Sequence, residues 1–104
     1  MSSEPRAPRG VPAVEWQRLT LFQRAVYRAA CRIPRGQTRT YQWIARRIGR
    51  PSASRAVGNA LRTNPFVPTV PCHRVIRSDG SVGGYARGHA RKRTLLAREG
   101  WNAA

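Results

Sequence analysis

The chain has 104 residues, enough for one small domain but not for two, and its 20 basic residues face only four acidic ones. The net charge of +16 indicates a polyanionic partner, with nucleic acid as the first candidate. The sequence has no apolar run near the ~20 residues that cross a bilayer, no secretory signal and only two cysteines, which argues against membrane insertion, secretion, a disulfide scaffold and a structural zinc site.

Residues 1–17 are rich in proline, serine, arginine and glycine, a composition typical of a flexible segment. We therefore expect a flexible N-terminal arm over residues 1–17, with Val14 and Trp16 docking on a single domain over residues 18–104. The patterns that follow predict a mainly α fold: a small winged-helix-like domain with a helix-turn-helix and a short β element after the loop that carries Cys72.

The first helix is predicted to begin after Thr20, because Gln23 stands three residues later and completes a capping box. Apolar residues then recur at helical spacing and form one stripe, made of Phe22, Val26, Ala29 and Ile33. Cys31 lies in this helix, where a structural thiol is the simpler interpretation. The sequence Pro34-Arg35-Gly36 ends the helix.

Two short helices joined by a Gly-Arg-Pro turn are predicted next, and together they form a helix-turn-helix pattern. Thr40 caps the first of them, Gly49 follows its C-cap, and Pro51 blocks its continuation. Ser52 is expected to cap the second helix, which stops at Asn64-Pro65. The apolar residues expected to face the core from the second helix are Ala53, Ala56, Val57, Ala60 and Leu61.

The outer face of the second helix carries a pattern suited to DNA. Arg55, Asn59 and Arg62 are spaced i, i+4 and i+7, so they point the same way. Ser54 and Gly58 lie beside them, and small residues let a helix backbone press close to a groove. A solvated basic face is the alternative interpretation.

A loop over residues 64–71 leads to the second cysteine, Cys72. Three prolines stiffen this loop because each fixes its own φ: Pro65, Pro68 and Pro71. Val75-Ile76 is then predicted as a short buried strand and Asp79-Gly80 as a turn. A last helix is expected from about residue 88 to Glu99.

Cys72 would need activation to act as a nucleophile, because a free thiol has a pKa of about 8.5 and is mostly protonated at pH 7. His73 adjoins it and could take the proton directly or through a water. Glu99 is one of two carboxylates in the folded part and could orient the imidazole. The residues alone leave alternatives open: a buried apolar thiol, a structural histidine, and a glutamate that merely neutralises basic neighbours.

The order of several motifs resembles the catalytic domain of the methylated-DNA–protein-cysteine methyltransferases, the O6-alkylguanine DNA alkyltransferases. The resemblance covers about residues 19–101, and its most specific signature is Pro71-Cys72-His73-Arg74-Val75. The other matching segments are Phe22-Gln23, Val26-Tyr27, Ile33-Pro34-x-Gly36-x-Thr38-x-Thr40-Tyr41, Arg55-Ala56-Val57-Gly58-x-Ala60, Asn64-Pro65, Ile76, Gly84-Tyr85 and Glu99-Gly100.

The resemblance implies DNA repair by direct transfer of an alkyl group from O6-alkylguanine to Cys72. His73 would be the base, acting through a water, and Glu99 would hold His73. Asn64 would brace the loop that carries the nucleophile. Because the product is a stable thioether and no residue is evident that could remove the alkyl group, the protein would act once and be consumed.

The resemblance also implies how DNA is bound. The damaged base would be flipped out of the duplex, as its reacting atom is buried there, and Arg55 would take its place in the base stack. The recognition helix would enter the minor groove. Apart from the resemblance, we also expect DNA contacts from Thr40, Ser54, Gly58, Asn59 and Arg62. Tyr41 would assist flipping and hydrogen-bond the base. The alkylguanine pocket would be completed by Val75, Tyr85 and Ala86.

The partner implied by charge and resemblance is double-stranded DNA containing O6-alkylguanine. We expect a monomer in the cytoplasm, associated with the nucleoid, with no membrane contact and no metal or other cofactor. Many family members carry an extra N-terminal domain before this one, where we expect only the short arm over residues 1–17. The chain also has Ala86 where relatives often have serine, which removes a hydroxyl but keeps a backbone N–H.

Two other functions stay open. The first is that of the non-catalytic alkyltransferase-like proteins, which bind and flag O6-alkylguanine. Those proteins typically carry tryptophan or alanine in place of the acceptor cysteine, whereas Cys72 is intact here. The second is a plain helix-turn-helix regulator, which would not need Cys72, His73 and Glu99 together.

Overall fold

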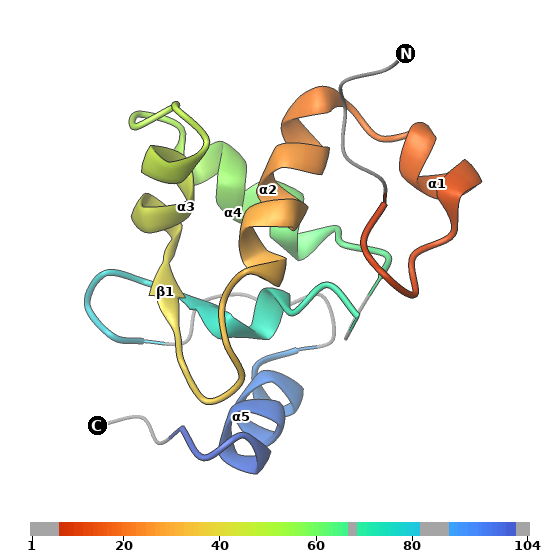
Figure 1. Ribbon diagram of the computed structural model, residues 1–104. Coiled ribbons are helices and arrows are strands. Elements are labelled where there is room, and N and C mark those ends of the chain that lie inside the picture. Colours follow the sequence, from red (N-terminus) through yellow and green to blue (C-terminus); the bar gives the residue numbers. More distant parts are fainter. Residues whose placement is uncertain (1–6, 67–68, 82–87, 102–104) are drawn as a thin grey trace.

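The computed structural model describes residues 7–66, 69–81 and 88–101, and most of its regular structure is helical (Figure 1). The elements in chain order are α1 (Ala13–Gln17), α2 (Leu21–Cys31), β1 (Arg39–Thr40), α3 (Tyr41–Arg47), α4 (Ser54–Arg62), the 3₁₀ turn η1 (Cys72–Arg74), β2 (Val75–Ile76) and α5 (His89–Arg98). The predicted fold class is confirmed: a small, mainly α domain with a helix-turn-helix and a short β element. Across these described ranges, no helix is both long and apolar enough to span a bilayer.

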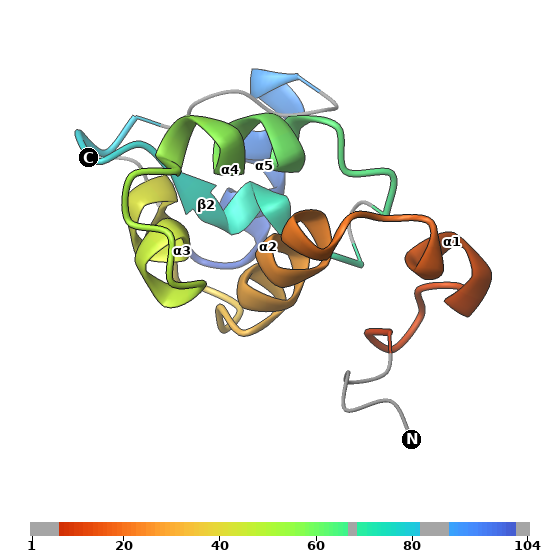
Figure 2. The same cartoon turned by 90° about the horizontal axis from the view of Figure 1, so that it is seen from above.

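Helices α2, α3 and α4 pack on one another and enclose much of the core (Figure 2). The capping box predicted for α2 is present: the Thr20 hydroxyl accepts from the Gln23 N–H at 3.0 Å, and the Gln23 side chain accepts from the Thr20 N–H at 2.9 Å. Tyr27 joins α2 to α4, since its buried hydroxyl donates to the Ala60 carbonyl at 2.7 Å. The apolar stripe that defines α2 in the sequence therefore faces the helix-turn-helix.

The segment before α2 is packed where a flexible arm was expected. Trp16 is 1 % exposed, and its ring centre lies 6.5 Å from those of both Tyr27 and Phe66. Val14, the other residue expected to dock, is 68 % exposed. The physical reason is that one large aromatic side chain buries enough apolar surface to offset the entropy of ordering a short helix. The docking predicted for Trp16 is thus confirmed and that for Val14 is wrong, while the helix over Ala13–Gln17 was not expected from the composition of the segment.

The turn of the helix-turn-helix is closed by side-chain bonds. Gln42 on α3 donates to the Pro51 carbonyl at 2.7 Å and accepts from the Ser54 hydroxyl at 2.7 Å. Ser54 is therefore committed to α3, and α4 starts at Ser54 itself, with Ala53 as an N-cap that makes no side-chain bond. The expected Ser52 cap is thus wrong, and Ala56 is exposed instead of facing the core.

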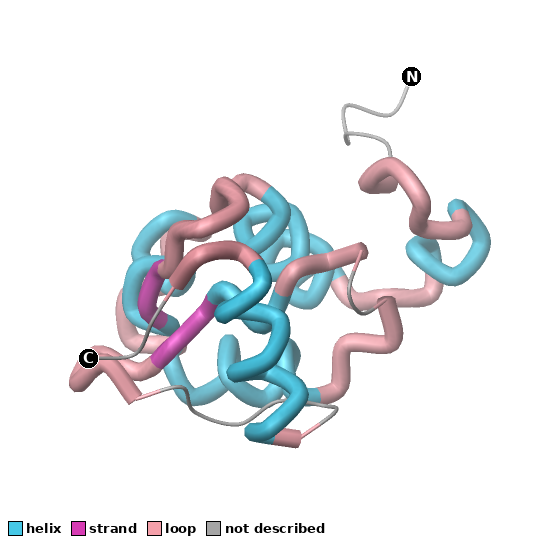
Figure 3. Tube along the Cα trace, turned by 90° about the horizontal axis from the view of Figure 1, so that it is seen from below, coloured by secondary structure: helices cyan, strands magenta, loops and turns pink. Residues whose placement is uncertain are grey.

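Strands β1 and β2 form a parallel pair in which Arg39 lies opposite Val75 and Thr40 opposite Ile76 (Figure 3). The predicted buried strand at Val75-Ile76 is confirmed, although the sequence did not indicate its partner. Because the strands are parallel, their carboxyl ends meet at one edge of the pair. The residues that follow them, Tyr41 and Arg77, therefore leave the pair on the same side.

Gly36 lies in the turn before β1 and closely approaches the end of α5. Its φ is +87°, and a Cβ atom built there would lie 2.9 Å from the Glu99 carbonyl oxygen. Helix α5 itself packs on η1, so this close approach helps to fix Glu99 beside the turn that carries Cys72.

We expect Gly36→Ala to destabilise the domain more than Gly49→Ala does. Both glycines have positive φ, which costs an L-residue about 1–2 kcal/mol, but a Cβ at Gly49 meets nothing within 4 Å. The difference between the two variants in urea-unfolding free energy isolates the contact with the Glu99 carbonyl. Equal losses would mean that this contact contributes nothing.

Candidate functional site

Cys72 is the first residue of η1 and is 3 % exposed. Its N–H donates to the Val70 carbonyl at 2.8 Å, and the Arg74 N–H donates to the Pro71 carbonyl at 2.9 Å. The backbone around the sulfur is therefore fixed on both sides. Cys31 is also a free thiol, and burial raises its pKa, which keeps it protonated at neutral pH.

Asn64 ties together the two ends of the loop that precedes Cys72. Its amide is buried, donates to the Val70 carbonyl at 3.0 Å and accepts from the Phe66 N–H at 2.9 Å. Buried amides are stabilised when both ends are bonded, and here both bonds go to loop backbone. This geometry suits the bracing role that the resemblance implied.

Glu99 is held between His73 and Arg74. Its Oε2 lies 3.0 Å from His73 Nε2, and the two side chains are only 7 % and 2 % exposed. The Arg74 guanidinium grips both carboxylate oxygens, with Nε donating to Oε1 at 2.8 Å and Nη2 to Oε2 at 2.7 Å. The Arg74 guanidinium also donates to the Ile33 carbonyl at 2.9 Å, which holds this fork of donors against the chain just after α2. Glu99 therefore faces η1 and pairs with two residues of that turn, His73 and Arg74.

The charges of this cluster follow from those contacts. The hydrogen bonds from Arg74 lower the pKa of Glu99 to about 2, so the carboxylate is ionised at neutral pH. Burial lowers the pKa of His73, and Glu99 offsets that effect only in part. A neutral imidazole that donates from Nε2 to Glu99 keeps its lone pair on Nδ1 and can accept a proton there.

Lys92 is a functional candidate that sequence reasoning missed. It is completely buried, its Nζ donates to the Val75 carbonyl at 2.7 Å, and the Tyr41 hydroxyl lies 3.4 Å from the same atom. Burial lowers the pKa of Lys92 to about 8, while a thiolate at Cys72 would favour the ammonium. The available signal was that Lys92 is the one lysine in a chain whose other basic residues are all arginine.

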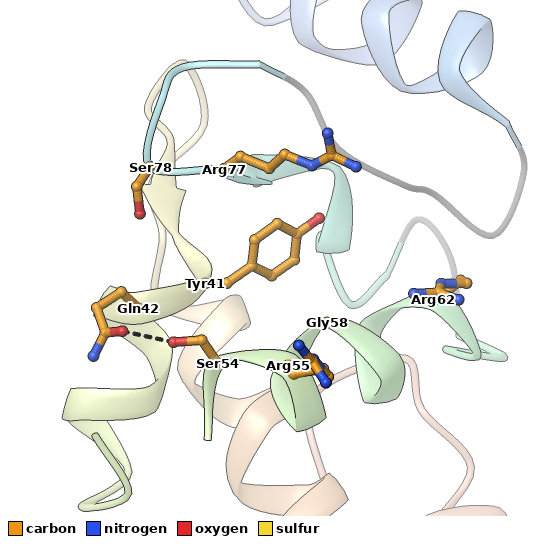
Figure 4. Close-up of a pocket in the computed structure, with 8 residues that line it drawn as sticks. All are labelled: Tyr41, Gln42, Ser54, Arg55, Gly58, Arg62, Arg77 and Ser78. Atoms are coloured by element: carbon orange, nitrogen blue, oxygen red, sulfur yellow. Dashed lines mark hydrogen bonds between the residues drawn. The ribbon is translucent and has the colours of Figure 1, made fainter. Parts of the chain in front are cut away.

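A cavity of about 550 Å³ opens between α4 and the loop after β2 (Figure 4). Its lining residues are Tyr41, Gln42, Ser54, Arg55, Gly58, Arg62, Arg77 and Ser78. Five of these were predicted as DNA or pocket residues from the sequence, whereas Gln42, Arg77 and Ser78 were not. Tyr41 sits between the two walls, and burial raises its pKa, so the hydroxyl is protonated at neutral pH.

The remaining predicted site residues are placed as follows. Thr40 caps α3 by accepting from the Trp43 N–H at 2.9 Å, and Asn59 accepts from Arg62 at 3.3 Å on the exposed face of α4. Val75 is buried, and its carbonyl already accepts from Lys92. Tyr85 and Ala86 lie outside the described residues. Within the described ranges, no group of three or more His, Cys, Asp or Glu side chains is arranged to hold a metal ion.

Comparison with known proteins places this arrangement in one family. The family described as "6-O-methylguanine DNA methyltransferase, DNA binding domain" matches residues 21–101. A methylated-DNA–protein-cysteine methyltransferase of Methanosarcina barkeri is 54 % identical over 80 residues, which cover 77 % of this chain and 51 % of that protein.

Solved structures agree with the sequence comparison. The OGT of Mycobacterium tuberculosis in complex with DNA has a TM-score of 0.77 and 51 % identity, covering 79 % of this chain and 51 % of that one. S. pombe Atl1, in complex with damaged DNA containing O6-carboxymethylguanine, has a TM-score of 0.72 and 40 % identity, covering 80 % of this chain and 79 % of Atl1. The chain thus spans about half the length of the methyltransferases it matches and most of the length of Atl1. It belongs to the 6-O-methylguanine DNA methyltransferase family.

Proposed function

We propose that this protein repairs DNA by transferring an alkyl group from the O6 atom of guanine to the sulfur of Cys72, once per molecule. The observation that carries the proposal is the placement of an intact Cys72 next to His73, whose imidazole faces the ionised carboxylate of Glu99 at 3.0 Å. The names of the M. barkeri and M. tuberculosis relatives support the same chemistry.

In the proposed reaction His73, directly or through a water, takes the thiol proton of Cys72. The thiolate attacks the alkyl carbon, so that an S–C bond forms while the C–O6 bond breaks and its electron pair stays on the guanine. The guanine anion then takes a proton from the protonated relay or from water. Glu99 stabilises the imidazolium that forms along the way, and Lys92 stabilises the thiolate.

DNA is bound, in this proposal, by the basic face of α4. Arg55 and Arg62 line the cavity with Tyr41, and Gly58 lets α4 lie close to the DNA backbone. Arg55 fills the gap left when the alkylguanine is flipped out, and Tyr41 steers the flipped nucleotide inward. Extrusion costs a few kcal/mol, and less for a poorly paired damaged base, which favours lesions over normal guanine.

Incubation with a duplex containing one O6-methylguanine is expected to add a single methyl group per protein molecule, mapped by peptide mass to Cys72. The reaction stops at one equivalent because the thioether is stable. Intact-mass spectrometry against a Cys72→Ala control checks both the site and the stoichiometry. A protein that gains no mass, or gains it at Cys31, contradicts the proposal.

Damage recognition without transfer is the second candidate function, and one observation favours it. The chain is 40 % identical to S. pombe Atl1 with a TM-score of 0.72, and the structure of Atl1 contains damaged DNA with O6-carboxymethylguanine. Lesion binding with unchanged protein mass, in the experiment above, would decide for this alternative.

A further inference from the structure

Arg77 is an exposed basic residue in the cavity wall that neither the motif resemblance nor the α4 pattern assigns. It follows β2 directly, just as Tyr41 follows β1. The parallel register of the two strands brings these residues to one edge of the sheet. The parallel pairing of β1 and β2 therefore positions both Arg77 and Tyr41 at the cavity.

The backbone beneath Arg77 is rigidly held. Its N–H donates to the Ser81 carbonyl and its carbonyl accepts from the Gly80 N–H, each at 2.9 Å. The Asp79 side chain accepts from the Ser81 N–H at 2.9 Å and from its hydroxyl at 2.7 Å, which closes the turn. Asp79 thus accepts its hydrogen bonds inside the turn; these bonds and, to a smaller extent, the nearby charge of Arg77 lower its pKa, and Asp79 is not among the residues that line the cavity.

The cavity has two basic walls. Figure 4 shows Arg77 reaching over Tyr41 from the β2 side, while Arg55 and Arg62 project from α4 on the opposite side. The positive charges of Arg77 and Arg62 both favour the ionised form of the Tyr41 hydroxyl, which places both near that group. No acidic side chain is among the lining residues that the structure describes. A cleft with arginines on both walls and no carboxylate is suited to a strand that carries phosphates.

We infer that Arg77 binds a phosphate of the DNA backbone beside the extruded nucleotide, from the side of the cavity opposite α4. Arg77 and the arginines of α4 would thus form a phosphate clamp. This inference rests on the proposed function, because it requires a nucleotide drawn into the cavity past Tyr41. The guanidinium binds a phosphate oxygen of the damaged strand, and Arg62 holds the backbone from the α4 side. Arg77 therefore contributes more to binding of lesion-containing duplex than of undamaged duplex, in which no nucleotide is extruded.

The test measures equilibrium binding in a Cys72→Ala background, which prevents transfer. The probes are a fluorescein-labelled duplex with one O6-methylguanine and the same duplex with guanine, each titrated at several NaCl concentrations. Arg77→Gln is expected to weaken lesion binding about five- to tenfold and to reduce the slope of log K against log salt by about 1. Binding of the undamaged duplex should fall about twofold at most, and Arg77→Lys should restore most of the lesion affinity.

Arg32→Gln is the matched control, because Arg32 is also an exposed arginine but lies at the C-terminal end of α2, outside the cavity. Equal effects of Arg77→Gln and Arg32→Gln on lesion binding overturn the inference. If the wild-type protein nevertheless gains a methyl group from the same duplex, the proposed alkyl transfer is supported and only the phosphate-clamp inference is wrong. If the wild type neither gains a methyl group nor prefers the lesion, both fail together.

Discussion

Glu99→Gln is expected to slow alkyl transfer to Cys72 by about 10²–10⁴-fold at pH 7.5, the range typical of general acid–base assistance. The amide carries no charge to stabilise the His73 imidazolium, and it cannot accept the full set of bonds from Arg74 and His73 at 2.7–3.0 Å. Single-turnover rates with excess lesion duplex, read by intact mass, measure the effect. Glu15→Gln, which neutralises an exposed carboxylate on α1, should leave the rate unchanged. A Glu99→Gln rate within threefold of wild type would remove the carboxylate from the relay.

The same variant should also change the response of stability to acid. The pKa of Glu99 falls from 4.5 to about 2 on folding, so its contribution is complete above pH 4.5 and is lost as the pH falls toward 2. The loss amounts to about 3 kcal/mol. Because the chain has only four acidic residues, few other side chains can produce such a change. Urea unfolding between pH 6 and pH 2.5 should therefore show a steep decline for wild type and a shallow one for Glu99→Gln.

Arg74→Gln separates the two roles of the carboxylate. It removes the fork on Glu99 and the bond to the Ile33 carbonyl but leaves the His73–Glu99 contact in place. We expect a loss of stability comparable to that of Glu99→Gln and a clearly smaller loss of transfer rate. Similar rate losses in both variants would mean that Glu99 acts mainly by supporting the fold.

The local signals in this sequence identified most elements correctly. The Thr20–Gln23 capping box, the Thr40 cap and Gly49 after α3 depend on residues three or fewer apart, so their structure can be read along the chain. The Ser52 cap failed because Ser52 lies inside the turn that the Ala53 N–H closes on the Arg50 carbonyl at 2.9 Å, and Gln42 on α3 bonds both sides of this turn. The docking expected for Trp16 is confirmed, but its partners Tyr27 and Phe66 are distant in sequence and could not be identified from it.

The residues of the candidate site also fall into two groups: those indicated by local sequence and those whose role depends on distant contacts. Cys72 and His73 are neighbours in sequence, and Glu99 could be proposed because carboxylates are scarce. Arg74, Lys92 and Arg77 were missed because each acquires its role from a partner 17 to 41 residues away or from a parallel strand register. In a chain with 20 basic residues, charge alone could not single out these three.

Lys92→Met is expected to slow transfer on the order of tenfold to a hundredfold at pH 7. Methionine has a similar length and fits a buried position, but it cannot stabilise a thiolate at Cys72 or donate to the Val75 carbonyl. Arg93→Met, on an exposed residue of the same helix, is the matched control and should react at the wild-type rate.

The pH dependence of this effect distinguishes electrostatic from structural action. The pKa of Lys92 is about 8 in the fold, so the wild-type ammonium loses its proton as the pH rises through 8, and the gap in rate between wild type and Lys92→Met should narrow. Over the same rise in pH, the folding stability of the wild type should increase relative to that of Lys92→Met. Between pH 8 and 9.5 the unfolded chain binds the proton more tightly than the folded one, so the wild type gains about 2 kcal/mol that the variant does not. A constant rate ratio from pH 6.5 to 9.5, with parallel stability curves, would mean that Lys92 acts by packing and hydrogen bonding alone.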